Sequence, residues 1–126
     1  MPEIVLINCF EVAAGREADF FSLWQQVNLY MRKKKGYRSH QLHRSLAPDA
    51  RYRFINVARW ASLEDFNAAH DEGFYRLVGR PEWADFPPFP MLYEVVNEAQ
   101  VEDNFTWRPL PINGTALGTG TGAVSN

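Results

Sequence analysis

The sequence predicts one α+β domain whose elements follow in the order β, α, β, β, α, β. Four short segments are rich in β-branched and aromatic residues, and between them lie segments in which apolar residues recur at helical spacing. Gly, Pro and Asp residues separate these segments, as is typical of turns. The chain has 126 residues, of which 46% are hydrophobic, so it can form one domain with its own core.

Composition excludes several classes of protein. The single Cys9 cannot form an internal disulfide and fits a reducing compartment. A net charge of −2 gives no general attraction for nucleic acid. We find no export signal and no stretch near the roughly 18 apolar residues of a membrane span. We therefore expect a soluble, cytoplasmic protein that binds neither nucleic acid nor membranes.

The first third of the chain predicts a strand and then a long helix. Residues 4–12 alternate so that Asn8 shares a face with apolar side chains. Residues 16–35 predict an amphipathic helix that ends at Gly36. The apolar stripe of this helix contains Phe20, Trp24, Val27 and Met31.

Residues 37–46 and 51–60 predict an antiparallel hairpin joined by a turn at Pro48. His40 and His43 lie on opposite faces of the first of these strands, so only one of them can face inward. Neither histidine has a partner at a metal-ligand spacing, which argues against zinc.

The strand over residues 51–60 carries a second unexplained amide. Asn56 lies on the face formed by Tyr52, Phe54, Ala58 and Trp60. A buried amide without a hydrogen bond costs roughly 1–3 kcal/mol, so Asn56 needs either a structural partner or a ligand.

The remaining elements are shorter. Ser62 and Asp65 predict the start of a helix in which Leu63, Phe66 and His70 share the core side. A short helix over residues 74–80 follows. Prolines 81, 87, 88 and 90 then predict an extended connection, in which Trp83, Phe86 and Phe89 cover a core or a cavity mouth. Residues 91–96 predict the last strand.

This order is the split βαβ pattern of a ferredoxin-like sheet with two helices on one face. We assign residues 1–98 to this domain. Residues 99–126 form a C-terminal extension that is rich in Gly and Thr, which we expect to be partly disordered or to contact a neighbouring subunit. The other face of the sheet keeps apolar residues, so we expect a homodimer that packs sheet against sheet.

Several runs resemble the antibiotic biosynthesis monooxygenase family. They are FEVAAGREADFFSLW, GYRSHQLHRSL, FINVARWASLEDF and MLYEVV. The resemblance covers roughly residues 3–98 and implies a dimeric α+β barrel with a substrate between sheet and helices. The members closest in pattern are oxygenases without a cofactor that convert anthrone-type aromatic polyketides to quinones. Their active-site Asn and Trp carry over to Asn56 and Trp60, and an Asn of their first strand carries over to Asn8.

This chemistry suits the two amides. An anthrone has an acidic CH₂, and its carbanion can pass an electron to O₂ without flavin or metal. Asn8 and Asn56 would stabilise the enolate oxygen, Trp60 would stack on the rings, and His43, His70 or a substrate phenol would handle protons. The residues that we expect to contact the substrate are Phe10, Trp24, Tyr52, Phe54, Phe66 and Tyr93.

Two alternatives stay open. A second branch of the same fold degrades haem with an Asn on the first strand, and Asn8 matches that position. The third reading is a dimeric small-ligand-binding protein that does not turn its ligand over.

Overall fold

The computed structural model describes residues 2–101, 111–112 and 115–116. The chain divides into two compact units, Met1–Glu94 and Val95–Asn126. In the second unit, the two-residue strands β5 (Pro111–Ile112) and β6 (Thr115–Ala116) pair with each other. The other expectations for the C-terminal extension fall mostly outside the described residues. No helix in the described part of the chain is long and apolar enough to span a membrane.

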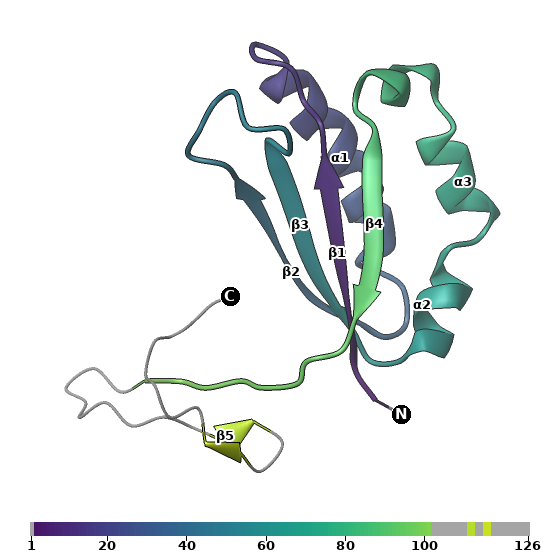
Figure 1. The fold of residues 1–126 in the computed structure, drawn as a ribbon. Helices are drawn as coiled ribbons and strands as arrows, with labels where there is room; N and C mark the ends of the chain where they lie inside the picture. The colour runs from purple at the N-terminus through teal and green to yellow at the C-terminus, as the bar shows by residue number, and fades with distance from the viewer. Residues whose placement is uncertain (1, 102–110, 113–114, 117–126) are drawn as a thin grey trace. The chain divides into compact units, whose positions relative to one another are not determined.

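The first unit is a four-stranded antiparallel sheet with its helices on one face (Figure 1). The strand order is β2-β3-β1-β4, which confirms the predicted ferredoxin-like α+β fold. The strands are β1 (Ile4–Phe10), β2 (Tyr37–Arg44), β3 (Phe54–Trp60) and β4 (Pro88–Tyr93). The helices are α1 (Glu17–Met31), α2 (Leu63–Ala69), α3 (Glu72–Val78) and the 3₁₀ helix η1 (Pro81–Asp85).

Helix α1 is shorter than predicted. It ends at Met31, so the three lysines at 33–35 lie in the following turn. Gly36 has a φ of 89°, and a Cβ at this position would overlap the Asp65 side chain. Both the left-handed conformation and the close approach therefore require glycine at this turn.

The third strand begins at Phe54 rather than Arg51. Residues 51–53 form a bend, although the Ser45 amide still donates to the Arg53 carbonyl at 2.8 Å. Tyr52 consequently lies outside the strand. Its ring packs edge-on against Phe89, with centroids 5.5 Å apart.

The last strand also starts earlier than predicted, at Pro88 rather than Met91. Pro88 and Pro90 pair with Phe10 and Asn8 of β1, and β4 lies at the border of the sheet. Proline lacks a donor but is tolerated in such a strand. The segment before it is the helix η1 and not an extended connection; within this region Phe86 is buried, while Phe89 is 41% exposed.

The region after β3 contains two helices joined at His70 and Asp71. Ser62 caps α2 as predicted, since its hydroxyl accepts from the Asp65 amide at 3.1 Å. Asp71 caps α3 in the same way through the Phe74 amide, which starts this helix two residues before the predicted position. The helices thereby follow the inner face of the sheet and enclose a cavity with it.

Candidate functional site

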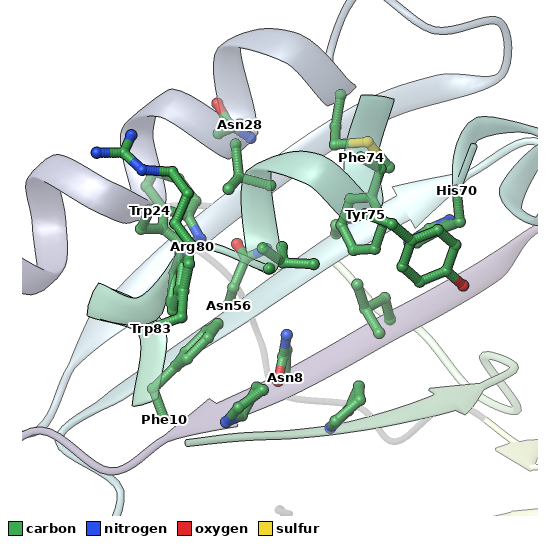
Figure 2. Close-up of a pocket in the computed structure, with 18 of the residues that line it drawn as sticks. Asn8, Phe10, Trp24, Asn28, Asn56, His70, Phe74, Tyr75, Arg80 and Trp83 are labelled. Atoms are coloured by element: carbon green, nitrogen blue, oxygen red, sulfur yellow. The ribbon is translucent and has the colours of Figure 1, made fainter. Parts of the chain in front are cut away.

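The cavity has a volume of about 700 Å³ and lies between the inner face of the sheet and the helices (Figure 2). This volume falls within the range of about 300–1,000 Å³ that is usual for small-molecule sites. All of its lining residues belong to the unit Met1–Glu94. The lining is mostly apolar and aromatic, and includes Phe10, Trp24, Val27, Met31, Phe66, Phe74 and Trp83.

Two amides lie side by side on the floor of this cavity. Asn8 of β1 and Asn56 of β3 are direct cross-strand partners, so their side chains leave the same face of the sheet at the same level. Both point into the cavity, between an end with Trp24, Arg80 and Trp83 and an end with His70, Phe74 and Tyr75 (Figure 2).

Three buried polar atoms on the lining have no hydrogen-bond partner among the described residues. They are Oδ1 of Asn8, Oδ1 of Asn56 and Nε1 of Trp60. Each such atom costs about 1–3 kcal/mol, which the fold does not recover by itself. Rotation of an amide about its terminal bond presents either its oxygen or its nitrogen, so a ligand in the cavity can satisfy it as donor or acceptor.

Trp60 lies deeper than expected. Its side chain is 1% exposed, and its ring is edge-on to Tyr37 and to Phe66, at centroid distances of 5.0 and 5.6 Å. These neighbours cover the indole, so a ligand could stack on Trp60 only if they moved. The indole N–H is buried as well and has no partner among the described residues.

His70 lies at the end of α2, where a hydrogen bond to the backbone determines which ring nitrogen carries a proton. Its Nδ1 is 2.6 Å from the Phe66 carbonyl, which can only accept, so Nδ1 carries the proton. In the neutral ring Nε2 is then an acceptor. The rings of Phe66 and Phe74 flank the imidazole, with centroids 4.1 and 4.5 Å away.

A second polar group adjoins the cavity at α1 and β2. The Tyr37 hydroxyl is 2.8 Å from Nδ2 of Asn28 and 2.9 Å from Nδ1 of His40. Burial raises the pKa of Tyr37 and lowers the pKa of His40, so both side chains are neutral near pH 7. Asn28 and Tyr37 belong to the cavity lining.

Arg80 brings a positive charge to the end of the cavity that Trp24 and Trp83 form (Figure 2). Its guanidinium donates to Gln26 at 2.6 Å and to Glu82 at 3.2 Å. The group is exposed, and the two contacts hold it beside the apolar lining.

Four of the residues predicted from the sequence lie outside the lining. His43 is exposed on the opposite face of β2, where Nδ1 lies 3.3 Å from the Ile55 carbonyl. Tyr52 lies in the bend before β3, and Tyr93 is 48% exposed on the outer face of β4. Phe54 faces inward but is buried in the core, stacked on Phe20 at 4.7 Å. The lining does contain Asn8, Asn56, Trp60, His70, Phe10, Trp24 and Phe66.

Asn28 is a residue of the cavity lining that the sequence could have predicted. Asn28 lies four residues after Trp24 on the buried stripe of α1, and it is 8% exposed. An amide on an apolar face is the same observation that pointed to Asn8 and Asn56. Arg80, at the end of the α3 region, had no comparable signal.

The donor set of the cavity consists of amides, a histidine, a tyrosine and an indole. Among the described residues, no three His, Cys, Asp or Glu side chains are grouped as a metal site. The arrangement can hold a flat aromatic molecule between apolar walls and offer amide dipoles to an oxygen on that molecule.

Comparison with known proteins agrees with this architecture. A family model described as antibiotic biosynthesis monooxygenase matches residues 3–77. No curated protein matches the chain. Among solved structures, a candidate monooxygenase from Shewanella loihica is 32% identical, the match covering 77% of this chain and 97% of that one, with a TM-score of 0.67.

Two further structures share the fold at lower identity. SnoaB, a cofactor-independent oxygenase from Streptomyces nogalater, is 21% identical over 78% of this chain and 97% of its own, with a TM-score of 0.65. A candidate antibiotic biosynthesis monooxygenase from Nitrosomonas europaea is 16% identical over 75% and 89%, with a TM-score of 0.58. By its family match and its relative in Shewanella loihica, the chain belongs to the antibiotic biosynthesis monooxygenase family.

Proposed function

We propose that the protein is a monooxygenase that needs no cofactor and uses O₂ to oxidise an anthrone-like or dihydroquinone-like aromatic polyketide to a quinone. The observation that carries this proposal is the cross-strand pair Asn8 and Asn56, whose amides point into an apolar cavity with unpartnered oxygens. Membership of the family supports an oxygenase, and the description of SnoaB as cofactor-independent supports chemistry without a bound group.

The reaction balances without a further reductant. The ring CH₂ of an anthrone loses a proton, and the electron pair of that bond spreads onto the carbonyl oxygen as an enolate. The carbanion passes an electron to O₂ and joins it to form a peroxide. Loss of water breaks the O–O bond and the remaining C–H bond, which leaves a quinone carbonyl. One CH₂ and one O₂ thus give one C=O and one H₂O.

Different residues of the cavity serve different steps of this reaction. The amides of Asn8 and Asn56 donate to the enolate oxygen, where the low polarity of the surroundings strengthens their effect. Trp60 supports the rings of Tyr37 and Phe66, which line the cavity beside it. His70 accepts a hydrogen bond from a substrate hydroxyl at Nε2, and Phe10, Trp24 and Phe66 contact the rings.

The test is oxygen uptake by protein treated with a chelator and given no flavin, with a panel of hydroxylated anthrones. We expect quinone formation above the spontaneous rate, and a kcat lower by about 10²–10³ in Asn56→Ala, as for the loss of one oxyanion donor. His70→Ala should also lose activity, whereas His43→Ala should keep it because His43 faces away from the cavity.

Two outcomes would contradict the proposal. A change in the spectrum of the anthrone without oxygen consumption would indicate a binding protein that does not turn its ligand over. A haem absorption band with Asn8-dependent haem breakdown would indicate the haem-degrading branch of the fold.

We further propose that the protein acts as a homodimer, which the family supports. The outer face of the sheet is the surface that we assign to the dimer, because Ile7, Ile55 and Val57 lie there beside the exposed side chains of Phe89 and Met91. The substrate cavity lies on the inner face, so each subunit keeps its own cavity.

A further inference from the structure

Asn28, Tyr37 and His40 form a chain of hydrogen bonds that leads away from the cavity. Asn28 and Tyr37 line the cavity, whereas His40 lies behind them and outside the lining. His40 is half-buried, and Trp24 contacts its ring edge-on at a centroid distance of 5.4 Å. The Tyr37 hydroxyl makes the shorter contact with Nδ1 of His40, at 2.9 Å, and Nδ2 of Asn28 lies 3.5 Å from the same nitrogen.

The chemistry of the donors fixes the direction of the hydrogen bond between Asn28 and Tyr37. Nδ2 of Asn28 can only donate, so the Tyr37 oxygen accepts from it at 2.8 Å. The hydroxyl proton is then free to point at Nδ1 of His40, 2.9 Å away. Burial keeps the imidazole neutral by lowering its pKa, and the positive charge of Arg32 acts in the same direction. We infer the tautomer in which Nδ1 of His40 accepts this proton and Nε2 carries the ring proton.

We propose that Tyr37 and His40 take the proton from the substrate carbon and later return it to the peroxide. In the first step the C–H bond breaks, its electron pair stays on the substrate, and its proton bonds to the Tyr37 oxygen. At the same time the hydroxyl proton of Tyr37 moves to Nδ1 of His40, which becomes an imidazolium. The reverse transfer delivers one proton to the peroxide when water leaves.

This inference rests on the proposed oxygenase function and assigns the proton step within it. Asn28 is a positioning residue, because it occupies one lone pair of the Tyr37 oxygen and leaves the other for the substrate. His70 lies at the end of the cavity formed by α2 and α3, apart from this chain of hydrogen bonds, and serves the substrate hydroxyl.

The experiment isolates proton transfer by leaving out oxygen. Protein and a hydroxylated anthrone are mixed under argon in a stopped-flow instrument, and the enolate absorbance is followed at saturating substrate. Tyr37→Phe keeps the ring that packs on Trp60, and His40→Gln keeps a polar side chain of similar length. Each should slow enolate formation by about 10² or more, the usual contribution of acid–base catalysis.

The double variant provides the sharper test. Two residues that pass one proton in sequence should be non-additive, so Tyr37→Phe with His40→Gln should be no slower than either single variant. Gln41→Ala, on the opposite face of β2, should match the wild-type protein. His43→Gln, on the same outward face of β2 and outside the cavity lining, should also form the enolate at the wild-type rate.

A second measurement does not depend on turnover. ¹⁵N NMR of the protein alone should show Nδ1 of His40 unprotonated and Nε2 protonated, with a shift of the Nδ1 signal in Tyr37→Phe. A protonated Nδ1 would overturn the proposal, and so would enolate formation by Tyr37→Phe at the wild-type rate or no enolate with the wild-type protein. Enolate formation without oxygen uptake would reject the oxygenase function but support the proton route through Tyr37 and His40. Oxygen uptake that is unaffected by Tyr37→Phe would support the oxygenase function but reject the proton route.

Discussion

Asn56 shows how one residue can favour function at the expense of stability. Its side chain is 7% exposed, and its Oδ1 has no partner in the described part of the chain. A hydrocarbon side chain of similar volume would avoid the cost of about 1–3 kcal/mol for an unpaired buried polar atom. Residues that lower the stability of a fold in this way are often found at functional sites, where activity is gained at the expense of stability.

We therefore predict that Asn56→Leu raises the free energy of unfolding by about 1 kcal/mol while oxygenase activity is lost. Urea denaturation followed by tryptophan fluorescence measures the first effect. Asn28→Leu is the matched control, because it removes an amide that does have a partner, Tyr37, and should lower the free energy of unfolding. Equal destabilisation by both substitutions would show that the Asn56 amide is structural.

Helix α3 forms one wall of the cavity, and a single carboxylate attaches it to α1. Asp71 accepts from the Tyr30 hydroxyl at 2.7 Å and from the Lys34 ammonium at 2.6 Å, and it also caps α3 through the Phe74 amide at 3.0 Å. The Lys34 ammonium, with these two further donors, holds the pKa of Asp71 well below its usual range. The ionised carboxylate thus stabilises the position of Phe74 and its neighbours beside the cavity.

Asp71→Asn tests whether the stabilisation of α3 depends on the negative charge of Asp71. Because folding lowers the pKa of Asp71, its contribution is present above the ordinary value of 3.8 and is lost as the pH falls through the lower pKa of the folded state. The variant should be less stable than the wild-type protein at neutral pH, and the difference should shrink below pH 3.8. Urea unfolding across this pH range measures it. Asp49→Asn, in the turn between β2 and β3, is the control and should be as stable as the wild-type protein at neutral pH.

The elements also show where prediction from the sequence ends. Alternation in β1 and β3 correctly placed Asn8 and Asn56 on the inner face, but not opposite each other, since register depends on how the strands pair. Alternation along β2 predicts only that His40 and His43 lie on opposite faces, and the pairing of His40 with Ala58 and of His43 with Ile55 places His40 on the inner face. The predicted start of β4 is wrong because prolines usually indicate a connection, whereas a strand at the border of a sheet tolerates them.

In the unit Met1–Glu94, the described helices lie on the inner face of the sheet, and none of them covers its outer face. Phe89, Met91 and Tyr93 alternate along the outer face of β4 and are 41%, 60% and 48% exposed. Exposed apolar groups that adjoin one another are typical of protein interfaces. A twofold axis through this face would bury the same surface on both subunits.

We predict that the wild-type protein has twice the chain mass by light scattering and that Met91→Glu has the mass of one chain. The side chain of Met91 is exposed in the isolated chain, so the charge should oppose dimer formation without disturbing the fold. Leu46→Glu, at a fully exposed position in the turn after β2, is the control and should remain dimeric. A single-chain mass for the wild-type protein would reject this interface.

The prolines of β4 limit how the molecule can assemble. Pro88 and Pro90 alternate with Phe89 and Met91 along β4. Because the pairing with β1 is continuous, the amide groups of Phe89 and Met91 can bond to β1. The side of β4 that faces away from β1 therefore lacks amide donors at both proline positions. A fifth strand from another chain would find carbonyls there without the matching donors, which protects the sheet against strand-by-strand aggregation. Association through the faces of the sheet stays open, while growth from this strand into a continuous β-structure is blocked.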